Sequence, residues 1–221
     1  MNRRHLALSL GASASLAALA ALAALPGPLR AQGAPAGFTE GRDYLKLDKP
    51  LSMPAGKIEV VEFFGYWCPH CNAFEPTLDA WVKALPAEQV NFRRVSIAFG
   101  VAQEPMQKLY FALESLGLVD SLHRKVFAAL HVQKLPMNKE ADIAAWAQAN
   151  GIDPAKILDA MKGFTVATKA RQARQLAEAY AIEGVPTLGI HGRYRTAPSI
   201  AGSEQRALAV TDSLIAQLHK R

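Results

Sequence analysis

The chain has 221 residues, half of them are hydrophobic, and the formal net charge is +6 at pH 7. This length supports a sizeable core in one domain, or in one domain that carries an insertion. No run of Lys and Arg indicates a nucleic-acid surface, so we expect no nucleic-acid partner.

The N-terminus has the pattern of an export signal. A short basic region at 2–5 precedes an alanine-rich apolar run at 6–25, which prolines and then small residues follow. This order is typical of a secretory signal peptide, and we predict removal of residues 1–31, with cleavage near Ala31. Removal takes away three arginines and no acid, so the mature chain is only mildly basic. A retained transmembrane anchor is the alternative, because the run can span a bilayer, and the paired arginines leave twin-arginine export open.

The next segment leads into an α/β pattern. Residues 32–39 are rich in Gly, Ala and Pro, so we predict a flexible lead-in at 32–43, and residues 44–47 alternate like a short edge strand. Residues 57–64 form a nearly continuous apolar run, which suits a central strand covered on both faces. Glu62 interrupts this run. A buried carboxylate is costly, so Glu62 either serves a site or reaches solvent at a sheet edge.

A helix should follow this strand and begin at Cys68. Pro69 then takes the first helical position, where its missing N–H costs nothing. Apolar residues recur at helical spacing up to Val82, and Pro76 is expected to kink the helix. Residues 90–97 predict the next strand, so a strand–helix–strand unit is complete by residue 97.

The remaining chain divides into a helical block and a returning α/β part. Four helices are predicted between about residues 103 and 161, and a longer one at 165–180. A turn at Gly184-Val185-Pro186 enters a short strand, Tyr194 is placed on its hairpin partner, and Ser203 caps a last helix. We therefore predict a helical insertion domain at 101–164 within an α/β domain formed by 44–100 and 165–221.

Cys68 and Cys71 are the two cysteines of the chain. Export implies an oxidising compartment in which disulfides persist. A structural disulfide gains most by closing a long loop, and a bridge between these positions closes almost none. An inert bridge is therefore the weaker interpretation, and a redox pair the stronger one.

The placement of Cys68-Pro69-His70-Cys71 at a helix start has chemical consequences. Cys68 lies near unpaired N–H groups and the positive end of the helix dipole, and His70 adds positive charge, so the Cys68 thiolate is favoured. Cys71 lies one turn further in. We expect one accessible, acidic thiol and one shielded thiol, which is the arrangement that thiol–disulfide exchange requires. A strongly stabilised thiolate makes the disulfide an oxidant.

Metal and haem sites need ligands that the sequence does not supply. Zinc would need more ligands than one Cys pair, and His123 and His131 are the remaining candidates. A c-type haem would need histidine where Asn72 stands. We predict no metal and no cofactor.

The segment Glu62-Phe-Phe-Gly-Tyr-Trp-Cys-Pro-His-Cys-Asn-Ala-Phe-Glu75 closely resembles the active-site segment of the DsbA family, periplasmic thiol:disulfide interchange proteins of Gram-negative bacteria. The resemblance covers about residues 40–219 and implies an α/β thioredoxin fold with an inserted all-helical domain. It also implies that Cys68 is the nucleophile, that Cys71 resolves the intermediate and that His70 tunes the thiolate.

The same resemblance assigns residues outside the cysteine motif. Val185-Pro186 matches a cis-proline loop that contacts substrate backbone, although the sequence alone favours an ordinary trans turn. Glu62 matches a buried acid with a raised pKa that relays a proton to or from Cys71. Glu75 is expected to be a solvated surface charge. The aromatic residues at 64, 66 and 67 either flank a peptide-binding groove or pack.

The expected function is donation of a disulfide to reduced, unfolded exported proteins in the periplasm, by a monomer. A DsbB-type quinone-linked membrane oxidase would reoxidise the pair. A reductase or isomerase is the second hypothesis, although too few residues precede Tyr44 for the N-terminal dimerisation domain that such isomerases usually carry. A non-catalytic peptide- or metal-binding module is the third, since fold alone does not set function.

Overall fold

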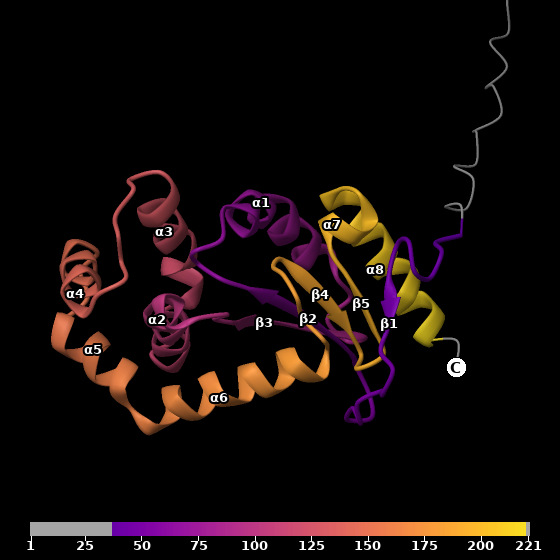
Figure 1. Cartoon of the computed structure of the whole chain (residues 1–221), viewed down its shortest axis with the longest axis horizontal. Coiled ribbons are helices and arrows are strands. Elements are labelled where there is room, and N and C mark those ends of the chain that lie inside the picture. Colours follow the sequence, from indigo (N-terminus) through magenta and orange to yellow (C-terminus); the bar gives the residue numbers. More distant parts are fainter. Residues whose placement is uncertain (1–36, 220–221) are drawn as a thin grey trace, which may run out of the picture. The chain divides into compact units, whose positions relative to one another are not determined.

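The computed structural model describes residues 37–219, and the predicted signal peptide lies outside them (Figure 1). Five strands form one mixed sheet in the order β1-β5-β4-β2-β3. They are β1 (Leu45–Lys46), β2 (Ile58–Phe64), β3 (Val90–Ser96), β4 (Thr187–Ile190) and β5 (Tyr194–Thr196). Because β2 pairs in parallel with β3 and antiparallel with β4, it is an interior strand.

Helices cover both faces of the sheet and one end of it (Figure 1). A single turn of 3₁₀ helix, η1 (Val101–Gln103), precedes the helical segment of α2 (Glu104–Ser115), α3 (Val119–His131), α4 (Glu140–Ala149) and α5 (Pro154–Lys162). The other helices are α1 (Pro69–Ala84), α6 (Phe164–Ala179), α7 (Pro198–Ala201) and α8 (Glu204–His219). The predicted helices and strands are confirmed to within a few residues. The short α7 was not predicted, since four residues are too few for a periodic pattern.

The alternation of strand side chains divides the core into two layers. Val61 and Phe63 of β2 are fully buried in a cluster that includes α6 and the helical segment. Ile58 and Val60 point the other way and pack with residues of α1 and α8. A strand buried on both faces is what the continuous apolar run predicted, and this fold is the α/β arrangement with an inserted helical segment that we expected.

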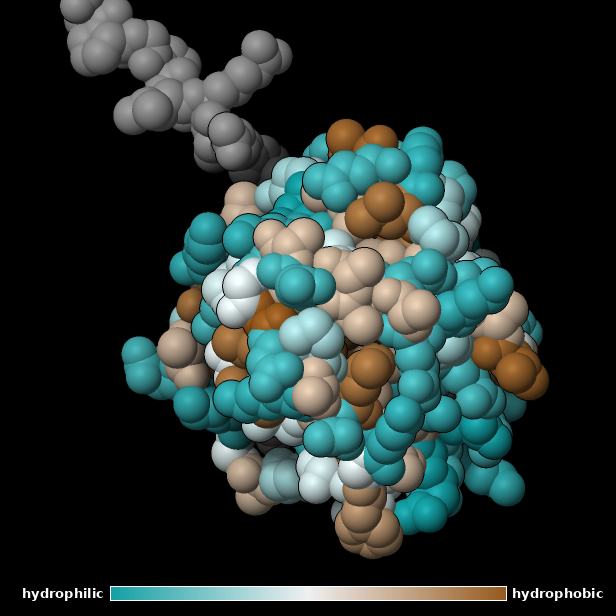
Figure 2. Space-filling model, turned by 90° about the vertical axis from the view of Figure 1, so that its left-hand side faces the viewer, coloured by the Kyte–Doolittle hydropathy of each residue, from teal (hydrophilic) through white to brown (hydrophobic). Residues whose placement is uncertain are grey.

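The helical segment shares a core with one face of the sheet. Leu109, Leu113 and Phe127 are fully buried, and the Phe127 ring lies 6.0 Å from that of Phe64 at the end of β2. On the face of the molecule that includes this segment, apolar side chains lie in separate groups among polar ones (Figure 2). Within residues 37–219, every helix is too short or too polar to span a bilayer. The boundaries of the insertion at 101 and 164 stay a prediction.

The described part of the lead-in is attached to the last helix. Asp43 is 2% exposed, and its carboxylate accepts hydrogen bonds from the backbone N–H of Thr39 and from the Arg206 guanidinium, the latter at 2.6 Å. These bonds lower the pKa of Asp43 to about 2, the Thr39 hydrogen bond contributing most. The predicted lead-in is therefore held in place at its C-terminal end.

Candidate active site

The two cysteines lie at the start of α1, as predicted. Cys68 is the N-cap residue with extended backbone (φ −89°, ψ 117°), Pro69 opens the helix, and the Cys71 backbone N–H donates a hydrogen bond to Cys68 Sγ at 3.3 Å. Both are free thiols, 3% and 0% exposed respectively. The expectation that Cys68 is accessible is therefore wrong, because surrounding segments cover it almost as completely as Cys71.

Acidity separates the two thiols much more clearly than exposure does. The pKa of Cys68 falls from 9.0 to about 6, mainly because it accepts a hydrogen bond from the Cys71 thiol. Backbone N–H groups of Cys71 and His70 lower this pKa further, and the charge of His70 contributes least among these causes. Burial raises the pKa of Cys71 far above its ordinary value, and the hydrogen bond to Cys68 and the charge of Glu62 add to the increase. At neutral pH the pair thus holds one thiolate and one thiol.

The loop before β4 lies directly beside Cys68. The peptide bond between Val185 and Pro186 is cis, which settles the question that the sequence left open. Cys68 Sγ lies 3.4 Å from the Val185 carbonyl oxygen, to which it donates a hydrogen bond when it is protonated. A cavity of about 250 Å³ adjoins this loop, and it is lined by His70, Val185, Pro186, Pro198, Ser199 and Glu204. Pro69 and His70 are both exposed to solvent.

Glu62 is fully buried in the interior strand β2, so the alternative of a solvent-facing residue at a sheet edge is excluded. Its Oε2 accepts a hydrogen bond from Arg94 Nε at 3.0 Å, and its Oε1 has no hydrogen-bond partner. Burial raises the pKa of Glu62 well above its ordinary value, the charge of Glu75 raises it further, and Arg94 opposes both. The Glu62 charge in turn contributes to the raised pKa of Cys71, and the role of Glu62 in proton relay stays a prediction.

Glu75 corrects one expectation, because it is fully buried rather than solvated. One amino group of Arg94 bonds Glu75 at 3.1 Å and Asp79 at 2.6 Å, so a single guanidinium contacts three carboxylates. Burial alone would raise the pKa of Glu75, but the hydrogen bond and charge of His123, together with Arg94, lower it below its ordinary value. Glu75 is an anion in the interior.

Two histidines of α3 contact the segment that precedes Cys68. His123 Nε2 lies 3.0 Å from Glu75 Oε1, and its Nδ1 lies 2.9 Å from the Tyr66 hydroxyl. His131 Nε2 donates to the Tyr66 carbonyl oxygen at 2.8 Å. These histidines therefore join the helical segment to the cysteine site. Within residues 37–219, no three His, Cys, Asp or Glu side chains are arranged to hold a metal ion.

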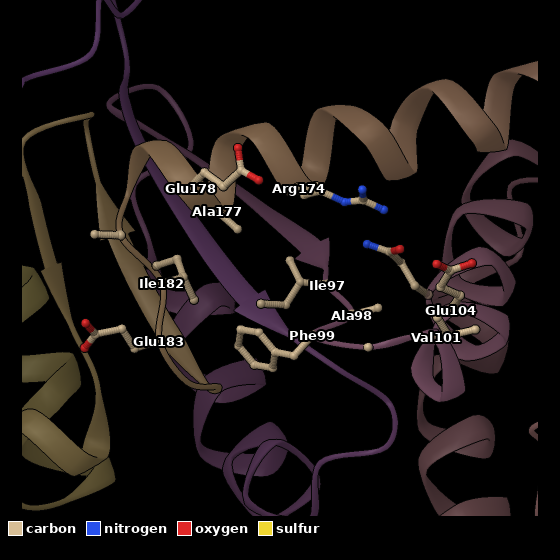
Figure 3. A pocket seen from close by; sticks show the side chains of 13 residues that line it. Ile97, Ala98, Phe99, Val101, Glu104, Arg174, Ala177, Glu178, Ile182 and Glu183 are labelled. Atoms are coloured by element: carbon tan, nitrogen blue, oxygen red, sulfur yellow. The ribbon is translucent and has the colours of Figure 1, made fainter.

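The aromatic residues around the motif have different environments. Phe64 and Tyr66 are fully buried and pack, whereas Trp67 is partly exposed and its ring lies 5.9 Å from that of Phe99, which is 50% exposed. Phe99 lines a cavity of about 530 Å³ between the end of β3, the start of α2 and the chain after α6 (Figure 3). In this view Arg174 extends from α6 toward Glu104.

The sequence reasoning missed Arg94, Asp79 and the role of His123. Arg94 had a detectable signal, because it is a charged residue within a strand that pairs in parallel with the strand of Glu62, and the two residues are register partners. His123 had none, since a histidine on a predicted helix carries no indication of what lies opposite.

Comparison with known proteins agrees with this geometry. A family model described as the DSBA-like thioredoxin domain matches residues 59–208. The thiol:disulfide interchange protein DsbA of Burkholderia cepacia is 38% identical, with 98% of this chain and 96% of that protein covered. The DsbA of Bordetella parapertussis is 41% identical, with 85% of this chain and 90% of that protein covered.

Solved structures show the same similarity. The crystal structure of Pseudomonas aeruginosa DsbA superposes with a TM-score of 0.79 at 35% identity, covering 83% of this chain and 95% of that one. The oxidoreductase DsbA from Xylella fastidiosa gives a TM-score of 0.76 at 30% identity, covering 83% of this chain and 98% of that one. The fold, the cysteine pair at the start of α1 and these matches together show that this chain belongs to the DsbA family.

Proposed function

We propose that this protein is a thiol:disulfide oxidoreductase that donates the Cys68–Cys71 disulfide to newly exported, reduced proteins in the periplasm. The observation that carries the proposal is the acidity of Cys68, whose pKa is about 6. A thiolate that is stable at neutral pH favours the reduced form of the pair. Each further pKa unit below ambient pH raises the reduction potential by about 30 mV. The protein therefore gives its disulfide away readily.

The reaction has two exchange steps. A substrate thiolate attacks Cys68 Sγ, the Cys68–Cys71 bond breaks, and its electron pair goes to Cys71 Sγ, which takes a proton. A second substrate thiolate then attacks the substrate sulfur of the mixed disulfide, and Cys68 leaves as a thiolate. The substrate loses two electrons and the pair gains them. Glu62, whose pKa burial raises well above its ordinary value, is proposed to supply the proton to Cys71.

Substrate recognition is proposed at two places beside Cys68. The backbone of Val185 and Pro186 faces the thiol and can contact an extended peptide, and the adjoining cavity lies on one side of it. At the second place, the exposed parts of Trp67 and Phe99 offer an apolar surface, and Phe99 lines the cavity of about 530 Å³. Apolar contacts of this kind suit unfolded chains, which expose apolar side chains of no fixed sequence.

The reduced pair must be reoxidised after each turnover. For this step we propose a membrane partner of the DsbB type, linked to a quinone, because the overall reaction needs an acceptor for two electrons. Two observations support these proposals. The relatives are named thiol:disulfide interchange proteins, which supports the partner, and the N-terminal sequence has the pattern of an exported protein, which supports the periplasmic location.

Oxidation of a reduced, unfolded protein by the purified disulfide form tests the proposal. Cys68→Ser should abolish it, and activity retained in this variant would refute the assignment. The reduction potential separates a donor from a reductase, since a value near that of thioredoxin, about −270 mV, would favour reduction. Metal content after purification, measured beside turnover, tests the non-catalytic alternative.

A further inference from the structure

His123 has two polar contacts in an otherwise aromatic environment. Its side chain is 6% exposed, and the rings of Phe64, Tyr66, Tyr110 and Phe127 lie 5.1–6.2 Å from its own. The two ring nitrogens contact the Tyr66 hydroxyl and the Glu75 carboxylate. Since tyrosine is neutral at ordinary pH, Glu75 is the charged group that directly contacts this imidazole.

The next contact in this network is shared. Arg94 bonds Glu75 and Asp79 through one nitrogen and Glu62 through another. One positive charge is therefore shared by three carboxyl groups, and the more it stabilises an anion at one of them, the less it stabilises an anion at the others. Glu62 is fully buried and its Oε1 has no hydrogen-bond partner, whereas the Asp79 side chain is 36% exposed to solvent.

We propose that His123 is a positioning residue for the proton transfer between Glu62 and Cys71, acting through Glu75 and Arg94. The inference rests on the proposed function. The hydrogen bond and the charge of His123 hold Glu75 as an anion, and the Glu75 anion both repels a second anion at Glu62 and draws on the charge of Arg94. Glu62 therefore keeps its proton.

The reacting step then follows without a further reagent. When a substrate thiolate attacks Cys68, the sulfur–sulfur bond breaks and the electron pair passes to Cys71 Sγ. The Glu62 carboxyl proton transfers to this sulfur, and Glu62 remains as a carboxylate bonded to Arg94. When the pair is reoxidised, the Cys71 proton returns to Glu62.

Other charged and titratable groups face this network. Tyr110 of α2 lies beside His123, and the positive charge of Arg124, on the same helix as His123, also lowers the pKa of Glu75. Arg124 makes no hydrogen bond to Glu75, whereas His123 does. Removal of His123 should therefore destabilise the ionised form of Glu75 more than removal of Arg124 would.

Carbon-13 NMR titration of the Glu62 side-chain carboxyl tests the proposal, using the reduced full chain with Glu62 assigned through Glu62→Gln. In His123→Gln, which keeps hydrogen-bonding capacity and loses the charge, the Glu62 midpoint should fall by about one pH unit. His131→Gln is the matched control. This substitution removes a hydrogen bond between α3 and Tyr66, but His131 makes no contact with Glu75, so the Glu62 midpoint should not change.

A second variant removes the group through which His123 acts. Glu75→Gln should lower the Glu62 midpoint while His123 is intact, and adding His123→Gln to it should change nothing more. An unchanged midpoint in His123→Gln, or an equal fall in His131→Gln, would overturn the proposal. The titration needs no turnover, so a protein that fails as a disulfide donor can still show this coupling, and the two proposals fail separately.

Discussion

The backbone N–H of Cys71 donates a hydrogen bond to the sulfur of Cys68, 3.3 Å away, so one cysteine of the pair stabilises the thiolate of the other. The helix start supplies backbone donors, and the Cys71 thiol supplies a further hydrogen bond that is the largest cause of the low Cys68 pKa. The acidity of the site is therefore a property of the pair as much as of the helix.

We predict that Cys68 ionises with a midpoint near pH 6, because that is the pKa its hydrogen bonds produce. Thiolate absorbance of the reduced protein in the far ultraviolet measures this midpoint. Cys71→Ser should shift it, since a hydroxyl replaces the thiol donor, whereas His70→Ser should raise it only slightly, because the His70 charge is the smallest of the causes. A larger shift for His70→Ser than for Cys71→Ser would contradict this order.

The same pKa predicts how the stability of the reduced protein depends on pH. The folded pKa lies below that of an unfolded cysteine, about 8.5, so the unfolded chain binds the thiol proton more tightly. The contribution of Cys68 is fully present above about pH 8.5 and is lost as the pH falls through about 6. Urea unfolding of the reduced protein at several pH values should show that the free energy of unfolding rises with pH between about 6 and 8.5. Cys68→Ala should remove this dependence.

Replacing Arg94 with Met should destabilise the fold by about 3–5 kcal/mol, because it leaves buried carboxylates without their shared cation. The loss should diminish at acidic pH, where these carboxylates take up protons. Arg93→Met is the matched control. Arg93 bonds Glu59 but is 41% exposed, so its removal should cost no more than about 1 kcal/mol. Equal losses in chemical denaturation would argue against a buried cluster.

Truncating Phe127 to Ala should cost about 3–5 kcal/mol, because the ring is fully buried between the helical segment and the end of β2. Its ring also lies 5.1 Å from those of Tyr66 and His123. Phe164→Ala, at a position 83% exposed, should change the free energy of unfolding by less than about 0.5 kcal/mol. Thermal unfolding of the two variants provides the comparison, and a small loss for Phe127→Ala would show that this contact is dispensable.

Much of the fold was predictable because its cues are local. The continuous apolar run at 58–64 predicted an interior strand, and Cys68 with Pro69 predicted the start of α1. The specific parts of the resemblance to the DsbA family were the segment around the cysteines and the Val185-Pro186 pair. These features depend on residues within a few positions of one another, so no knowledge of the tertiary structure was needed.

The residues around the cysteines were harder to predict because their partners are distant in the chain. Glu75 lies on α1 at a position that suits a solvated charge, and α3, which begins 44 residues later, supplies His123 across from it. Arg94 reaches Glu62 only because β2 and β3 pair in register. Burial is set by what packs on top of a residue, and sequence spacing on one helix does not report it.

The sequence by itself determined the redox motif, the order of helices and strands, and the strand that carries Glu62. Only the tertiary structure decided that Glu62, Glu75 and Asp79 share one arginine, that His123 contacts Glu75, and that the Val185–Pro186 bond is cis beside Cys68. The reason is physical. Hydrophobic periodicity fixes a local element, but the charge and proton chemistry of a buried group depend on every segment that removes water from it.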